Sequence, residues 1–324
     1  MKENFMKGNY GIFVHYLVKH NDPSVTSEEW NEQTEGFDAE GLARQAHEAG
    51  AKWVYLTMGQ ASGHYNAPNS AYDKFMEEYP SKCSKRDLPL ALYEALKPYG
   101  IRLCLYMPSE GPQKLGWHFN KNRETGELYS DRLADFQLKW EEVITEWSLR
   151  YGDKVSAWWV DSCYFPDVMY NFPDRPNFLS FAAALRAGNP DALLAFNNGW
   201  KIPTESMTVE DDYTAGELAT FLPIAFDRFP IKIKTKQKGV VPMSEAPIQY
   251  HLLCSLGRDW GHLVKTDELR FPNELVMGYT EYILGMGGAI TWEVPIDVHG
   301  LMNENHLRQL RLTKEHMEKV AKKS

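Results

Sequence analysis

The sequence lacks the features that would place this protein in a membrane or in an oxidising compartment. Only four of its 324 residues are cysteine, and none of them belongs to a Cys-x-x-Cys pair or has the spacing of a metal site. This pattern predicts no structural disulfide and suits a reducing compartment. No run approaches the roughly 20 apolar residues of a membrane-spanning helix, and the first residues lack the apolar core of a signal peptide. We therefore expect a cytoplasmic protein that does not contact a membrane.

Positive charge is in the minority. Lysine and arginine total 35 against 44 acidic residues, which gives a formal net charge of -9. Nucleic acid is therefore not expected as a partner, and a neutral or cationic ligand is favoured. Hydrophobic residues make up 43% of the chain, enough for a large core. Neither a linker nor an internal repeat is visible, so the sequence predicts one domain over residues 1–324.

Strand-like apolar runs alternate with segments of helical periodicity, which is typical of a parallel sheet built from βα units. The helices often end at glycine, and Asp38 is a plausible N-cap. Eight strands would close a (β/α)8 barrel, so the predicted fold class is α/β with a single TIM-like barrel. The expected strands are 10–16, 52–58, 101–107, 155–160, 192–196, Met207–Glu210, Val240–Ser244 and 289–294. One expected helix begins after Phe37. The other expected helices span 88–98, 131–151, 178–187, 274–284 and 304–322.

One acidic residue, Asp161, ends an apolar run that carries two adjacent tryptophans. A carboxylate at the C-terminal end of a barrel strand, walled by aromatic rings, is a common way to present a nucleophile to an anomeric carbon. An aspartate in this position can also be a turn former or a helix N-cap. The run alone therefore leaves both interpretations open.

Several segments, taken in order from about residue 9 to residue 301, resemble the catalytic barrel of the α-L-fucosidases, glycoside hydrolase family 29. Residues 11–16, GIFVHY, are similar to the family's GIFxHW strand, and Glu29-Trp30 stands where the family has an EW pair. The most specific match is FDAEGLARQAHEAGAKWVYLT at residues 37–57. Residues 87–107 and 287–300 also match family segments, and Asp259-Trp260-Gly261 resembles SWGY.

The resemblance implies a pair of catalytic carboxyl groups. Trp158-Trp159-Val160-Asp161 falls where the family's LWFDG carries its nucleophile. Asp212 to Glu217 resembles a DFxTAE segment that ends in the acid/base, so Glu217 is the favoured acid, with Glu210 and Glu245 as alternatives. A retaining enzyme needs one ionised carboxylate and one protonated carboxyl group about 5–5.5 Å away.

Other residues are candidates for substrate binding. The family's KHHDGF segment reads Gly59-Gln60-Ala61-Ser62-Gly63-His64 here, so both paired histidines are replaced and the sugar is not fixed as fucose. His64 and Tyr65 could refill that space, and aromatic rings could stack on the sugar or belong to the core. Glu293 replaces an asparagine and could bind sugar or form a salt bridge. The candidates are His15, Glu29, Trp30, Gln60, His64, Tyr65, Trp159, Trp260, Trp292 and Glu293.

The resemblance favours a retaining exo-glycosidase of the α-L-fucosidase type that acts on a small carbohydrate or glycoside. Two alternatives stay open: the same mechanism on another sugar, such as L-galactose, and a sugar-binding barrel without catalysis. A metal-dependent hydrolase is disfavoured because His15, His20, His47 and His64 lack the spacing of metal ligands, so we expect neither metal nor cofactor. We also expect no C-terminal β-sandwich, and self-association is possible.

Overall fold

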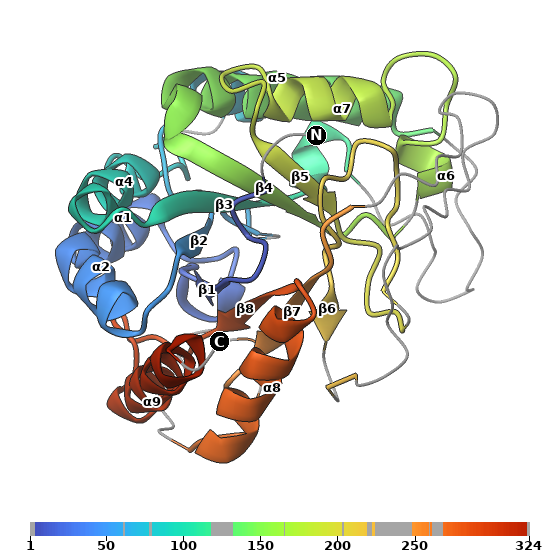
Figure 1. Ribbon diagram of the computed structural model, residues 1–324. Coiled ribbons are helices and arrows are strands. Elements are labelled where there is room, and N and C mark those ends of the chain that lie inside the picture. The colour runs from blue at the N-terminus through green and yellow to red at the C-terminus, as the bar shows by residue number, and fades with distance from the viewer. Residues whose placement is uncertain are drawn as a thin grey trace.

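The computed structural model describes residues 4–60, 62–77, 80–117, 132–164, 166–202, 204–218, 222–223, 248–258, 260 and 268–322 (Figure 1). Its strands are all parallel and follow the order β5-β4-β3-β2-β1-β8-β7-β6, which is the order of a (β/α)8 barrel. The strands are β1 (Tyr10–Val14), β2 (Trp53–Thr57), β3 (Arg102–Pro108), β4 (Val155–Asp161), β5 (Leu193–Phe196), β6 (Glu217–Leu218), β7 (His251–Ser255) and β8 (Ala289–Glu293).

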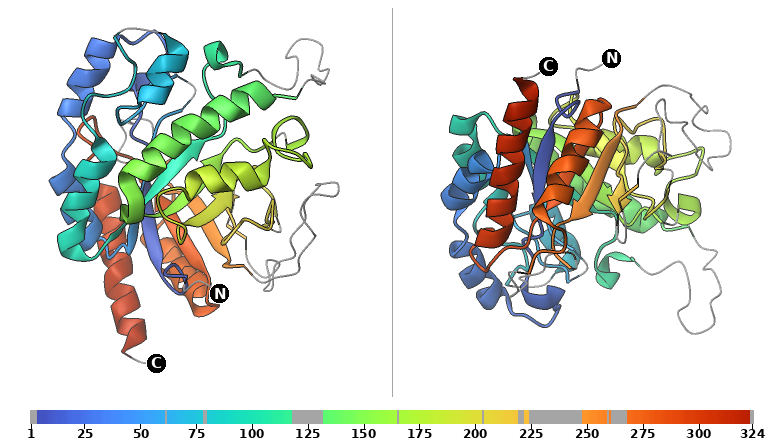
Figure 2. Two further views of the ribbon diagram at one scale, coloured as in Figure 1. Left: turned by 90° about the horizontal axis from the view of Figure 1, so that it is seen from above. Right: turned by 60° about the horizontal axis from the view of Figure 1, so that its bottom comes forward.

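Helices cover the outside of this curved sheet, and the views in Figure 2 place α8 beside α9. The helix α2 begins as predicted, because the Asp38 side chain accepts a hydrogen bond of 2.7 Å from the backbone N–H of Gly41. The helices are α1 (Ser27–Glu35), α2 (Ala39–Glu48), α3 (Ser70–Met76), α4 (Leu88–Leu96), α5 (Ala134–Tyr151), α6 (Pro166–Met169), α7 (Phe178–Leu185), α8 (Asn273–Gly285) and α9 (Glu304–Ala321). Short 3-10 turns span Lys19–Asn21, Lys97–Tyr99, Gln113–Leu115 and Gly152–Lys154.

Side chains that alternate along the strands form two apolar layers. One layer packs between sheet and helices, and the other fills the barrel interior with rings such as Phe13, Trp53 and Trp159. Gly11 makes room for this filling, since a Cβ atom there would lie 2.3 Å from Nε1 of Trp53. The interior formed by the described strands is therefore a packed core, and its rim offers space for a ligand.

Six of the eight predicted strands are confirmed. Of the other two predictions, one is wrong and one falls outside the described residues. The segment Met207–Glu210 is a turn instead of a strand, because its backbone N–H groups at Met207 and Thr208 donate to the Asp211 carboxylate at 2.6 and 3.0 Å. The sixth strand is instead β6. The prediction Val240–Ser244 falls outside the described residues, and the seventh strand is β7.

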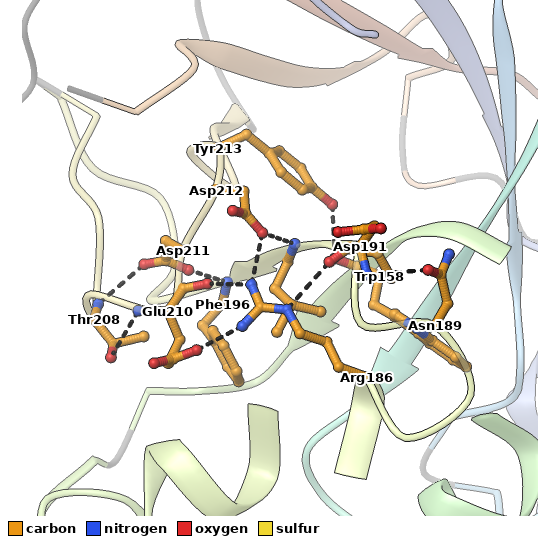
Figure 3. A network of polar contacts seen from close by, with 12 residues as sticks. Trp158, Arg186, Asn189, Asp191, Phe196, Thr208, Glu210, Asp211, Asp212 and Tyr213 are labelled. Atoms are coloured by element: carbon orange, nitrogen blue, oxygen red, sulfur yellow. Dashed lines mark hydrogen bonds and ion pairs between the residues drawn. The ribbon is translucent and has the colours of Figure 1, made fainter. Parts of the chain in front are cut away.

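Side-chain carboxylates join β5 to the segment that leads into β6 (Figure 3). Asp211 accepts a hydrogen bond of 2.8 Å from the backbone N–H of Phe196, and Asp212 accepts one of 2.9 Å from that of Leu194. The backbone N–H of Asp212 donates in return to the Leu194 carbonyl at 2.8 Å. The two carboxylates thus replace strand carbonyls as hydrogen-bond acceptors. We call this junction between β5 and the segment before β6 the seam.

Arg186, just after α7, holds the outer side of the same seam. Its guanidinium forms ion pairs of 2.6 Å with Glu210 and 2.7 Å with Asp212. In Figure 3 these side chains converge on Arg186 from the segment that precedes β6. The seam is consequential for the candidate site because Asn197 follows β5 directly and Glu217 begins β6.

Candidate functional site

The candidate site is formed at the rim where neighbouring strands end. Asp161 is the last residue of β4 and Asn197 follows β5. Glu217 belongs to the two-residue strand β6 and is paired with Leu253, two residues before β7 ends. Parallel strands place their carboxyl ends at one rim of a barrel, so polar side chains at these positions meet there.

Asp161 is held by three hydrogen-bond donors. The Tyr106 hydroxyl donates to Oδ2 at 2.6 Å, and Oδ1 accepts from the Asn197 amide at 2.8 Å and from the Tyr164 hydroxyl at 3.2 Å. The next residue, Ser162, has a backbone φ of 62°, which only few non-glycine residues adopt. Such strained backbone is concentrated at functional sites, and here it directly follows Asp161.

One amide group links Asp161 to Glu217. Nδ2 of Asn197 donates to Oδ1 of Asp161 at 2.8 Å and to Oε2 of Glu217 at 2.7 Å. The amide is oriented by its other end, since Oδ1 of Asn197 accepts from the backbone N–H of Gly199 at 3.1 Å. The two accepting oxygens therefore lie no farther apart than the two hydrogen-bond lengths added together. This upper bound agrees with the ~5–5.5 Å separation of the carboxyl groups in a retaining pair.

Glu217 is the more acid-like member of this pair. Burial and, to a smaller extent, the nearby negative charge of Asp161 raise the pKa of Glu217 to about 6, although the hydrogen bond from Asn197 lowers it. A carboxyl group with this pKa is about half protonated at pH 6 and about one tenth protonated at pH 7. It can therefore donate a proton while a neighbouring carboxylate stays ionised.

A small pocket, with a cavity volume of about 90 Å³, opens over these carboxylates. This volume lies below the usual range for ligand sites, about 300–1,000 Å³, so the pocket leaves room for one small ring at most. Its walls carry aromatic and polar groups together. The lining residues are His15, Gln60, Tyr106, Trp159, Asp161, Glu217, Leu253 and Trp260.

His15 forms one wall and is backed by a buried carboxylate. Its Nδ1 lies 3.1 Å from Oε1 of Glu293, which is 0% exposed. The other oxygen of Glu293 accepts a hydrogen bond of 2.5 Å from the Ser255 hydroxyl. These contacts agree with the interpretation of Glu293 as the partner of another side chain, here His15.

Gln60 lies between Asn21 and Tyr106. Its carbonyl accepts from the Asn21 amide at 3.1 Å, and its own amide donates to the Tyr106 hydroxyl at 3.0 Å. Because Tyr106 donates in turn to Asp161, a chain of hydrogen bonds runs from the pocket wall to the carboxylate.

Two tryptophans line the pocket as well. Trp159 stacks on Tyr106 with ring centroids 5.5 Å apart, and its indole N–H donates to the carbonyl of Ala215 at 3.0 Å. Trp260 lies 5.9 Å from the His15 ring, measured between centroids. Both rings are placed where an apolar sugar face could stack.

The other predicted residues that the structure describes, fully buried Tyr65 among them, do not line this pocket. Trp30 is in the core, where its indole donates to the Tyr65 carbonyl, and Trp292 is in the core beside α8. Glu29 caps α1 through a hydrogen-bonded pair with Thr26. Buried His64 contacts the Val25 carbonyl at 3.0 Å, and Glu210 forms an ion pair with Arg186. Glu245 lies outside the described residues.

Three polar residues of the site were not predicted from the sequence: Tyr106, Asn197 and Tyr164. Tyr106 and Asn197 had a usable signal, since each stands at the carboxyl end of a predicted strand, as Asp161 does. Tyr164 had none, because it lies in a loop and reaches Asp161 only through the turn at Ser162.

In the described part of the chain, no group of three His, Cys, Asp or Glu side chains is arranged to hold a metal ion. No helix among the described residues has the length and apolar character needed to cross a bilayer. All four cysteines are buried and free of disulfides.

Comparison with known proteins gives one family and a group of related folds. The family model described as alpha-L-fucosidase matches residues 1–322. Among solved structures, an endo-fucoidan hydrolase of glycoside hydrolase family 107 has a TM-score of 0.73 at 19% identity, over 98% of this chain and 53% of the other. This chain thus spans about half the length of that enzyme. No curated protein sequence matches it significantly.

Solved fucosidases also share the fold. Alpha-L-fucosidase isoenzyme 1 from Paenibacillus thiaminolyticus has a TM-score of 0.65 at 16% identity, over 97% of this chain and 74% of the other. The family 29 alpha-L-fucosidase from Bacteroides thetaiotaomicron has a TM-score of 0.63 at 16% identity, over 97% and 72% of the two chains. At these identities the likeness concerns the fold.

Proposed function

This chain belongs to the α-L-fucosidase family, and we propose that it is a retaining glycoside hydrolase that removes a single α-linked L-fucose from a small glycoside. The observation that carries the proposal is the Asn197 amide, which donates to Asp161 and Glu217 at once. This contact supports a separation suited to attack by one carboxyl group and proton donation by the other.

In the first step, Asp161 attacks the anomeric carbon while the glycosidic C–O bond breaks. Glu217 gives its proton to the departing oxygen, and a sugar ester of Asp161 forms. The raised pKa of Glu217, about 6, favours this assignment of roles.

In the second step, Glu217 is a carboxylate and removes a proton from water. The water oxygen bonds to the anomeric carbon, the ester bond to Asp161 breaks, and the sugar leaves with its original configuration. The hydrogen bonds from Tyr106 and Asn197 hold Asp161 ready for attack and stabilise it as a leaving group.

The small size of the pocket supports removal of a terminal sugar, because a cavity of about 90 Å³ leaves no room for several rings. Trp159 and Trp260 would stack on its apolar face, and His15 would bind a hydroxyl group. Fucose is proposed on the family match. Since Gln60 stands where a histidine would in the fucosidase-like segment, L-galactose is the second candidate sugar. The fold likeness to an endo-fucoidan hydrolase makes fucoidan a third substrate to test.

The test is hydrolysis of aryl α-L-fucoside, aryl α-L-galactoside and other common pyranosides, together with fucoidan, by wild type and Asp161→Asn. We expect release of one sugar with retained configuration by NMR, and loss of at least about 10³-fold in kcat for the variant. Cleavage with inverted configuration would overturn the retaining mechanism. Binding of a sugar without any turnover would favour a non-catalytic barrel.

A further inference from the structure

Glu293 is a fully buried carboxylate at the edge of the pocket, and the mechanism above does not use it. It is 0% exposed, and buried ionised carboxylates are costly unless hydrogen-bond donors surround them. Its donors include the Ser255 hydroxyl at 2.5 Å and Nδ1 of His15 at 3.1 Å. His15, in contrast, lines the pocket.

The barrel register builds this arrangement. Glu293 is paired with Phe13 across β1 and β8, and with Ser255 across β7 and β8. His15 follows Phe13 by two residues, so the three polar side chains come from the ends of three adjacent strands. Their backbones are fixed by sheet pairing, which makes the contact a rigid part of the rim.

We propose that Glu293 is the specificity-determining positioning residue of this site, which holds a proton on His15 Nδ1 and thereby directs the other edge of the ring to one hydroxyl group of the bound sugar. An ionised carboxylate has only acceptor atoms, so the proton of the 3.1 Å contact resides on the imidazole. The Ser255 hydroxyl satisfies the second carboxylate oxygen and keeps the first one directed at His15. The inference rests on the proposed function for the identity of the ligand.

Three aromatic rings also pack around the His15 ring. It lies 4.4 Å from Phe13, 5.8 Å from Tyr106 and 5.9 Å from Trp260, measured between ring centroids. These contacts restrict where the imidazole can be, and the Glu293 contact chooses which nitrogen carries the proton. Loss of Glu293 should therefore change hydroxyl recognition more than it changes pocket shape.

The experiment compares Glu293→Met, which lacks an acceptor, with Glu293→Gln, which keeps one. Glu141→Met is the matched control, because Glu141 is also buried but bonds to Gln137 and Ser180 away from the pocket. The substrates are an aryl α-L-fucoside and its analogues in which each ring hydroxyl in turn is replaced by hydrogen.

For wild type we expect one deoxy analogue to lose about tenfold or more in kcat/KM, mostly through KM. Glu293→Met should show that loss already with the parent substrate and no further loss with that analogue. Glu293→Gln should stay within about threefold of wild type, and Glu141→Met should keep the wild-type pattern. Equal deoxy penalties in wild type and Glu293→Met would overturn the proposal.

A second measurement is independent of turnover. In protein labelled with ¹⁵N-histidine, NMR should show the His15 signal, identified by its loss in His15→Asn, with Nδ1 protonated in wild type and Glu293→Gln. Glu293→Met should shift the proton or leave both tautomers populated. An unchanged His15 signal in Glu293→Met would refute the role of Glu293. If wild type hydrolyses no fucoside, the proposed function fails, while this measurement still decides the inference.

Discussion

The hydroxyl group of Tyr106 lies 2.6 Å from Oδ2 of Asp161 and donates its hydrogen to that carboxylate. Tyr106 itself is 1% exposed, and burial together with the Asp161 charge holds its pKa well above the ordinary value. The phenol thus stays protonated and acts as a permanent donor to the candidate nucleophile. Gln60 fixes the phenol from its other side.

We first predict that Tyr106→Phe lowers kcat/KM about tenfold, because one short hydrogen bond to the ionised carboxylate is lost. The phenylalanine ring keeps the stacking on Trp159, so the pocket wall should survive. Steady-state hydrolysis of an aryl fucoside measures the effect. Tyr164→Phe is the control, since its 3.2 Å bond comes from a half-exposed side chain and should matter less than about threefold. Equal effects of the two changes would contradict this ranking.

The second prediction concerns the bridge at Asn197. Its hydrogen bond lowers the pKa of Glu217, so Asn197→Ala should raise that pKa further above its value of about 6. The alkaline limb of the pH profile of kcat/KM should move to higher pH while the maximal rate falls. A pH series with one aryl glycoside measures both changes. An alkaline limb that moves to lower pH would mean that Asn197 does not stabilise the ionised acid.

Third, wild-type activity should decline as pH rises through about 6, because the acid must be protonated to assist departure of the leaving group. Glu217→Ala should lose this limb, and azide should restore turnover of a substrate with an activated leaving group. Glu210→Ala is the matched control, since Glu210 pairs with Arg186 outside the pocket. Azide rescue in the Glu210 variant, and none in the Glu217 variant, would reassign the acid.

The fourth prediction tests the seam between β5 and β6. Asp211→Ala removes the acceptor of the backbone N–H groups of Phe196, Met207 and Thr208, all of them buried. We expect a loss of at least about 3 kcal/mol in the free energy of unfolding, measured with urea. Glu210→Gln weakens only the partly exposed pair with Arg186 and should cost less than about 1 kcal/mol. Similar losses for both variants would show that the buried carboxylate does not hold the seam.

The sequence was a good guide to those strands that form long buried runs. Both β2 and β4 are almost entirely buried, so they read as continuous apolar segments. The strand β6 has only two residues and gives no periodic signal, and its closure depends on Asp211 and Asp212, whose carboxylates bond to β5. Contacts of this kind are tertiary, so no local pattern encodes them.

The candidate site could be predicted only in outline. The strand ends indicated Asp161, and the family resemblance indicated Glu217, whereas their link through Asn197 depends on how three strands meet. Trp30 shows a second limit of prediction from the sequence. It was a plausible sugar platform from the sequence, yet it is 1% exposed in the core, because sequence position does not say which face of an element is buried.

The most direct test of Asp161 as nucleophile is to trap the sugar ester with 2-deoxy-2-fluoro-α-L-fucosyl fluoride and locate the label by peptide mass spectrometry. The fluorine at C2 destabilises the oxocarbenium-like transition states, and the good leaving group lets the first step outpace the second. We predict one added fluorosugar on the peptide that contains Asp161, and none in Asp161→Asn. A label on another carboxylate, or rapid hydrolysis of fucosides with no label formed, would contradict the assignment.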